Sequence, residues 1–243
     1  MKQPFIERTY FFFTYARVIL DDELLRRLIH KQAYSYIVGL SHENLSFDVP
    51  VSVRKKQTIN IYLNKPMEEI FRGYSDTARN EIRRTEKMEG LQFTRDDGKW
   101  GDVYAMYLKH RNARGLPVHT CSFLQQCMLF NAYWNGTLIS TITCYDAHPY
   151  LRIQNIFSRL DGGDKELRRI AGFAARRLVH EICTYGNGNG YQLLDMASAN
   201  FTNPARAGIT QFKNSFGGVV SDEYTYTYKS ALARFAGRIR NMV

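Results

Sequence analysis

The sequence lacks the features of a membrane-spanning, disulfide-bonded or metal-binding chain. No apolar run approaches the ~20 residues that a helix needs to cross a bilayer. The apolar stretch near the N-terminus is too short for a signal peptide, so we expect a protein of the cytoplasm or one peripheral at a membrane. The four cysteines show neither CxxC nor metal-type spacing, so we expect free thiols, no metal site and no permanently bound cofactor.

Acidic residues are scarce relative to basic ones. Against 33 lysines and arginines stand 23 aspartates and glutamates, which leaves a net charge of +10 at pH 7. A basic excess favours an anionic partner such as nucleotide phosphates, RNA or a membrane surface. Part of the excess gathers in residues 79–87 and 168–177, although a solvated helix face would also explain either cluster.

Internal repeats, low-complexity tracts and Pro/Gly/Ser-rich linkers are absent, so periodicity and turn signals indicate the elements. Asn135-Gly136 between two apolar runs predicts a type I′ hairpin. Apolar residues near a 3.6-residue period predict a long helix over residues 165–185. The expected strands are 10–20, pieces within 33–63, 91–94, 128–134, 137–145, 151–159, 191–195 and 219–228. The expected helices are 21–32, 66–87 with an interruption near 75, 101–113, 165–185, 205–215 and a basic amphipathic one from residue 230.

This order of elements predicts an α/β fold with a mixed sheet. An antiparallel meander is followed by a βαβ unit, whose crossover helix joins neighbouring strands. Where the strand at 151–159 parts from the strand at 191–195, we expect a ligand to enter. We divide the chain into residues 1–57, which form a lid or a reduced sister domain, and residues 58–243, which form the main domain.

Two regions of the chain resemble the Fem-type group of the GNAT acyltransferase superfamily. Residues 71–75 and the basic run 78–87, followed by Glu89-Gly90-Leu91, resemble the group's "sxxxRxxIRxAeKxGv" segment. Phe212-Lys213 with Phe216-Gly217 resembles its "FKxxFG" signature.

A third segment adds to the resemblance. Leu194-Asp195 matches the "yDlgG" strand end of the group, with residues 196–198 in place of the usual glycines. The resemblance covers about residues 60–228 and implies a GNAT-like acyltransferase fold. It also implies an N-acyltransferase that moves an acyl group from acyl-CoA, or from an acyl carrier protein, to a primary amine such as an amino sugar or an amino acid.

The resemblance leaves other functions open. Fem-type proteins that form peptidoglycan bridges take an amino acid from aminoacyl-tRNA, so tRNA is an alternative partner. Such proteins usually have two domains of this kind, and the shorter length of this chain favours acyl-CoA. A non-catalytic relative that binds RNA or a membrane is a further alternative, because fold alone does not fix function.

A run in the predicted long helix suggests the binding site of the acyl-CoA co-substrate. Residues 169–174 fit the R/QxxGxG/A pattern with which GNAT proteins bind the CoA pyrophosphate, where small residues and free N–H groups at a helix start approach the phosphates. A helix that packs small residues on a sheet would show the same run. The predicted donor-binding residues are Arg169, Gly172, Ala174, Phe212 and Phe216.

Three residues are predicted to be catalytic. Lys213 could stabilise the oxyanion together with a backbone N–H near residues 156–158, or it could be a surface lysine. Asp195 ends a buried strand, where it could act as a base or cap the next turn. Asn200 could orient the acceptor or form a turn.

Three further residues are predicted to bind substrate. Arg79 and Arg83 lie four residues apart and therefore on one helix face, where they could bind phosphate or an anionic acceptor. Tyr226 belongs to a stripe of alternating tyrosines that could supply a phenol to the leaving group. The same stripe could be an ordinary sheet face.

Overall fold

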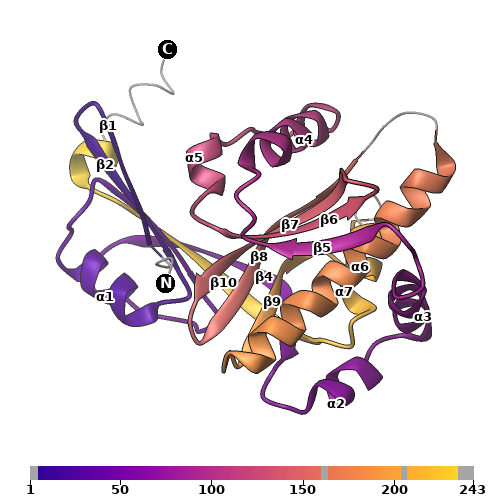
Figure 1. The fold of residues 1–243 in the computed structure, drawn as a ribbon. Helices are drawn as coiled ribbons and strands as arrows, with labels where there is room; N and C mark the ends of the chain where they lie inside the picture. The colour runs from indigo at the N-terminus through magenta and orange to yellow at the C-terminus, as the bar shows by residue number, and fades with distance from the viewer. Residues whose placement is uncertain (1–4, 160–163, 204–206, 235–243) are drawn as a thin grey trace. The chain divides into compact units, whose positions relative to one another are not determined.

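The computed structural model describes residues 5–159, 164–203 and 207–234 (Figure 1). The chain divides into two compact units. The first contains the chain up to Thr58 and again from Val220, and the second contains Ile59–Val219. The boundary expected after residue 57 lies next to this division, but the C-terminal strand, which we assigned to the main domain, belongs to the first unit.

The first unit combines sheet strands with a helix of nine residues. Its strands follow the order β1-β2-β3-β10-β4, where β1 is Phe5–Tyr10 and β2 is Phe13–Ile19. Helix α1 (Asp22–His30) begins at Asp21, whose side chain accepts the Leu24 N–H at 2.9 Å. The other strands are β3 (Tyr36–Ser41), β4 (Val51–Tyr62) and β10 (Val219–Lys229).

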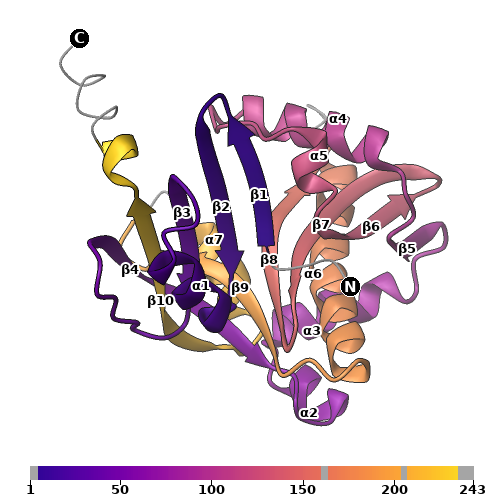
Figure 2. The ribbon, with the colours of Figure 1, turned by 90° about the vertical axis from the view of Figure 1, so that its left-hand side faces the viewer.

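One expected strand of this unit is wrong. Residues 10–20 form parts of two antiparallel strands, β1 and β2, because the chain reverses at Phe11 and Phe12 (Figure 2). Neither phenylalanine is a turn-forming residue, so the sequence carries no sign of this reversal.

The second unit confirms the expected fold class, a mixed α/β sheet. Its strands follow the order β4-β9-β8-β7-β6-β5, and β6 (Met128–Trp134) and β7 (Thr137–Ala147) form the predicted hairpin. Asn135 and Gly136 both have positive φ, 46° and 74°, as a type I′ turn requires. The remaining strands are β5 (Leu91–Arg95), β8 (Tyr150–Ser158) and β9 (Leu193–Ala199).

Helices cover both faces of the sheet in this unit (Figure 1). Helix α6 (Lys165–Gly188) is the crossover between the parallel strands β8 and β9, and it lies with α3 (Asp76–Thr85) on one face. Helices α4 (Trp100–Asn112) and α5 (Cys121–Leu124) lie on the other face. The unit also contains α2 (Met67–Arg72) and α7 (Ala207–Asn214).

Helix α6 forms the centre of the hydrophobic core of the second unit. One side of it buries Ile170, Ala174, Leu178 and Ile182 against the sheet, close to the predicted period. The helix continues three residues beyond the expected end at residue 185, to Gly188. Gly186 is helical and packs so closely that a Cβ there would lie 2.5 Å from a Leu63 methyl group.

No helix among the described ranges is long and apolar enough to span a membrane. Of the helix expected from residue 230, residues 231–234 are helical, and the remainder lies outside the described residues.

Two of the segments that carry the family resemblance meet in space. A Cβ added to Gly217, which has a φ of 65°, would lie 2.1 Å from the Gly73 carbonyl oxygen. Next to this contact the Ser75 N–H donates to the Ser215 carbonyl at 2.8 Å. The glycine of the "FKxxFG" signature is therefore explained by close backbone packing.

We expect Gly217→Ala to lower the free energy of unfolding by about 3 kcal/mol or more, measured by urea denaturation. The change adds the ~1–2 kcal/mol cost of a left-handed conformation to a clash with backbone. The matched control is Gly98→Ala, at a φ of 74° with open space around its Cβ, where only the conformational cost applies. Equal losses in the two variants would contradict the close packing.

Candidate functional site

Strands β8 and β9 run side by side over only three residue pairs. The parallel pairing begins at Tyr150 with Leu193 and ends at Arg152 with Asp195. This last pair is also a buried ion pair, in which the guanidinium of Arg152 donates to Asp195 Oδ2. Beyond it the two strands part, as expected from the order of elements.

The second oxygen of Asp195 helps to turn β9 away from β8. Asp195 Oδ1 accepts the backbone N–H of Ala197 at 2.7 Å. Ala197 has a φ of 61°, a left-handed conformation that favours glycine. Ala197 is thus one of the three residues that stand where the Fem-type pattern has glycines, and its conformation explains why glycine suits this segment.

Lys213 of α7 holds the diverted end of β9. Its Nζ donates to the carbonyl oxygens of Ala197 at 3.1 Å and Ser198 at 2.9 Å. Only 7% of Lys213 is exposed. The ammonium is therefore fixed beside the gap between the strands and does not extend into solvent.

Strand β8 is irregular at the same place. Thr143 of β7 pairs with Asn155 and Cys144 with Ile153, so Gln154 has no partner of its own on β7. A bulge of this kind bends a strand and redirects its side chains, and bulges are common next to active sites.

A cavity of about 480 Å³ opens where the strands part. Its walls come from β8, the end of β9, the middle of α6, helix α7 and the end of α4 with the residues after it. Four of its described lining residues are cationic, and no described lining residue is Asp or Glu. The cations are Arg111, Arg114, Arg176 and Lys213, and the apolar lining includes Leu116, Ile156, Phe157, Ile209 and Phe212.

Other groups hold these cations in place. Arg111 donates from Nε and Nη2 to the Pro117 carbonyl at 2.8 and 2.6 Å. Arg176 pairs with Glu81 at 2.8 Å and lies 5.3 Å from the centre of the Phe212 ring. A positive, partly apolar cavity of this kind suits an anionic ligand that also carries an apolar part.

His110 contributes a neutral ring to the cavity. Burial, together with the positive charges of Arg114 and Arg111, lowers the pKa of His110 to about 4. Its buried Nδ1 has no hydrogen-bond partner among the described residues. His110 and Ser158 also line a second cavity of about 560 Å³, to which Asp102 contributes a carboxylate.

The structure brings three of the predicted site residues to the first cavity. Lys213, Phe212 and Gly172 line it. A Cβ added to Gly172 would meet no atom within 4 Å, so the absence of a side chain there leaves space open. Asp195 is fully buried in its ion pair, where it shapes the gap.

The remaining predicted donor-binding residues lie elsewhere. Arg169 is exposed and pairs with Glu166 at 2.8 Å, while Ala174 and Phe216 are buried in the core. Helix α6 begins at Lys165, and Asp164 Oδ1 accepts the N–H groups of residues 166 and 167 at 2.9 and 3.0 Å. Gly172 lies about two turns further on, where the helix itself uses the backbone N–H groups.

Asn200 forms a turn after β9. Its Oδ1 accepts the N–H groups of Thr202 and Asn203 at 3.1 and 3.0 Å. This is the second of the two roles that the sequence allowed.

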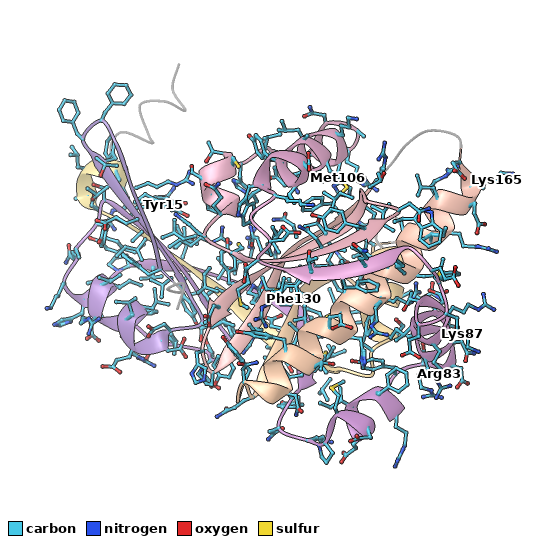
Figure 3. The ribbon with its side chains drawn as sticks, viewed as in Figure 1. Tyr15, Arg83, Lys87, Met106, Phe130 and Lys165 are labelled. Carbon is cyan, nitrogen blue, oxygen red and sulfur yellow. The ribbon has the colours of Figure 1, made fainter. Side chains whose placement is uncertain are left out.

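The predicted substrate-binding arginines are on α3. Arg79 donates to the Arg72 carbonyl at 2.7 Å and pairs with Asp76, so it joins the end of α2 to α3. Arg83 is exposed (Figure 3), and its guanidinium lies 5.5 Å from the centre of the Phe71 ring.

Tyr226 is in the first unit. It is fully buried, and its hydroxyl donates to the Glu43 carbonyl at 2.8 Å and accepts the Leu45 N–H at 2.6 Å. Both hydrogen-bonding functions of the phenol are therefore used to hold a loop.

Sequence reasoning missed the part of the cavity that α4 supplies. Residues 107–116 contain two arginines and a histidine at the end of the helix, which resembles ordinary C-terminal helix charge. Only the packing of α4 on β8 places them beside Gln154 and Gly172, and that packing has no local sequence signal.

No family model matches the chain, and no curated protein matches its sequence. Among solved structures, the chain is similar to FemX, with a TM-score of 0.63 and 11% identity over 95% of this chain and 85% of FemX. It is also similar to L-PGS from Bacillus licheniformis, with a TM-score of 0.55 and 14% identity over 89% of this chain and 78% of L-PGS. These similarities show that the chain has the fold of FemX and L-PGS, in agreement with the fold that the sequence motifs implied.

We expect Ala197→Gly to raise the free energy of unfolding by up to about 1 kcal/mol. Glycine removes the left-handed strain of ~1–2 kcal/mol, and its extra freedom in the unfolded chain offsets part of the gain. The control is Ala199→Gly in the same strand, where we expect a loss of about 1 kcal/mol. Urea denaturation measures both, and a loss of stability in Ala197→Gly would show that its conformation is not strained.

We expect His110 to make stability depend on pH. Its pKa is lower in the folded chain than the unfolded value of about 6.5, so only the unfolded chain takes up a proton as the pH falls from 6.5 towards 4. The free energy of unfolding is therefore independent of this ring above pH 6.5, and it decreases as the pH falls from 6.5 towards 4. In His110→Gln the decrease in the free energy of unfolding between pH 6.5 and 4 should become smaller by this contribution. His30→Gln is the control, because His30 is exposed, and it should keep the decrease. An unchanged slope in His110→Gln, from urea unfolding at several pH values, would contradict the burial of this ring.

Proposed function

We propose that this chain is an N-acyltransferase that moves an acyl group from a phosphate-bearing donor to a primary amine. The observation that carries the proposal is the cavity where β8 parts from β9, with four cations and no Asp or Glu among its described lining residues. Its cations suit donor phosphates, and its apolar residues suit the chain that links the phosphates to the acyl group. The GNAT-like fold supports this class of reaction.

The reaction needs no covalent enzyme intermediate. The lone pair of a neutral amine attacks the donor carbonyl, a C–N bond forms, and the bond to the leaving thiol or hydroxyl group breaks. The amine loses a proton and the leaving group gains one. Backbone N–H groups of β8 near Ile156 and the charge of Lys213 would stabilise the oxyanion, and one such donor is typically worth about 10²–10³ in rate.

The second cavity supports a route for the acceptor. It shares His110 and Ser158 with the first cavity, and its lining includes the carboxylate of Asp102 beside the cations of Lys109 and Arg159. His110, neutral at pH 7, would accept a hydrogen bond from the attacking amine at the junction.

Acyl-CoA is the first candidate donor. The open space at Gly172 and the apolar wall at Ile209 and Phe212 suit a narrow chain such as that of CoA. In this arrangement the arginine side chains, and not the amides of residues 169–174, would bind the phosphates.

Aminoacyl-tRNA is the second candidate, and one observation favours it. Asp164 occupies the N–H groups of residues 166 and 167, which makes the described start of α6 less suited to a pyrophosphate. The name of a further structural neighbour, a protein of Agrobacterium fabrum assigned as a lysylphosphatidylglycerol synthetase, also refers to an aminoacylated product. Its C-terminal domain has a TM-score of 0.57 and 11% identity over 91% of this chain and 80% of that domain.

A ligand that binds the folded chain raises its melting temperature by mass action, so thermal shifts can identify the donor. The rise in melting temperature is compared for acetyl-CoA, longer acyl-CoAs and charged tRNA. We expect Gly172→Leu to weaken binding of the effective donor at least about tenfold, because the leucine side chain would fill the cavity. Its own melting temperature should not fall, because leucine is the better helix former.

Gly188→Leu is the matched control, since Gly188 is at the far end of the same helix and a Cβ there also meets no atom within 4 Å. Donor binding should be unchanged in this variant. Unchanged binding in Gly172→Leu would place the donor elsewhere. Salt-sensitive RNA binding without binding of any donor would favour the non-catalytic alternative.

A further inference from the structure

The β1–β2 hairpin exposes two phenylalanines at its tip. Tyr10 pairs with Phe13, so Phe11 and Phe12 alone form the turn. Phe11 is 96% exposed and Phe12 is 89% exposed. No other large apolar residue of the described ranges is exposed to this extent.

Neither turn geometry nor packing explains these two residues. Phe11 is the first residue of the two-residue turn and has a φ of 53°. Two-residue turns with positive φ at this position favour glycine, and a bulky side chain there is strained. The two residues of the tip therefore differ from those that favour such a turn. Differences of this kind are expected at functional positions.

The surroundings of the tip are aromatic and basic. Tyr15 of β2 (Figure 3) stacks on Tyr36 of β3, with 5.6 Å between the ring centres. Lys229, at the end of β10, pairs with Tyr36 in register and lies 5.6 Å from its ring centre. The beginnings of β2 and β3 and the end of β10 therefore lie at the same end of this unit as the hairpin turn.

The chain that leaves this end adds positive charge and apolar side chains. Leu232 is 62% exposed, and Arg234 is exposed after it. From Lys229 to the last residue the sequence contains Arg234, Arg238 and Arg240 and no Asp or Glu. The same unit also contains an acidic residue, Glu7 of β1, whose carboxylate accepts a hydrogen bond from the Tyr34 hydroxyl at 3.0 Å.

We propose that the hairpin tip inserts into the interfacial region of a membrane that contains anionic lipids. Phe11 and Phe12 would enter the acyl boundary, the two tyrosines would lie at the headgroups, and Lys229 and Arg234 would contact lipid phosphates. This combination of apolar tip, aromatic ring pair and basic residues matches the layers of a bilayer surface. Proteins that bind single-stranded RNA instead stack bases on rings along a groove, whereas these phenylalanines form a turn.

The test is co-sedimentation of the full chain with vesicles of equimolar phosphatidylcholine and phosphatidylglycerol, and with phosphatidylcholine alone. We expect binding to the anionic vesicles that weakens with added salt, because the charge component is screened. In the double variant Phe11→Gly/Phe12→Ser, binding should fall at least about tenfold, because two buried rings are lost. The variant should keep or gain stability, since glycine suits the turn.

Val53→Ser is the matched control, because Val53 is an exposed apolar residue of the same unit, 51% exposed, on β4. It should bind vesicles like the unchanged chain. Loss of binding in Val53→Ser equal to that in the double variant would overturn the role of the tip.

A second measurement does not depend on loss of binding. Phe11→Trp should bind anionic vesicles, and its fluorescence should shift to the blue on binding, relative to the same variant without vesicles, with quenching by lipids labelled in the upper acyl chain. No binding of the unchanged chain to anionic vesicles, or no change in the fluorescence of bound Phe11→Trp, would overturn the proposal. Tip-dependent binding to a single-stranded RNA oligonucleotide, with none to vesicles, would also overturn it.

Discussion

A buried ion pair between Arg152 and Asp195 determines where the sheet of the second unit opens. It is the last of three pairs between β8 and β9. Removing one partner of a buried pair leaves an uncompensated charge, which typically costs ~3–5 kcal/mol. The pair therefore fixes the two strands up to this point, and the other oxygen of Asp195 turns Ala197 away from it. The hydrogen bonds from Lys213 to β9 and the cavity both lie just beyond this last pair.

The cavity is prepared for an anion before any ligand arrives. Arg111 is held by a carbonyl, Arg176 by Glu81, and Lys213 by two carbonyls, so little side-chain freedom remains to be lost on binding. Because no described lining residue is acidic, these charges are only partly neutralised. Fixed charges in a partly buried cavity act more strongly than mobile ones in water, which is what a reaction with a developing oxyanion requires.

The sequence predicted the features that depend on local chemistry. The Asn135-Gly136 turn, the start of α6 and the parting of β8 from β9 follow from turn residues, apolar periodicity and element order. It did not predict the reversal at Phe11, because no turn residue marks it, nor the end of α6, because Gly186 is retained for close packing and not as a helix breaker. Of the four cations that line the cavity, only Lys213 was predicted as a site residue, because it lies in a motif, whereas Arg111 and Arg114 reach the cavity through the packing of α4.

The order of β10 in the first unit has a consequence for synthesis on the ribosome. This strand lies between β3 and β4 but is made later than both, after the second unit. The two ends of the second unit are adjacent, since a Cβ on Gly218 would lie 2.6 Å from an Ile59 methyl group, so that unit closes on itself once residue 219 has emerged. Until β10 has emerged as well, the nascent chain carries β3 with an unpaired edge, so the first unit finishes folding after the second.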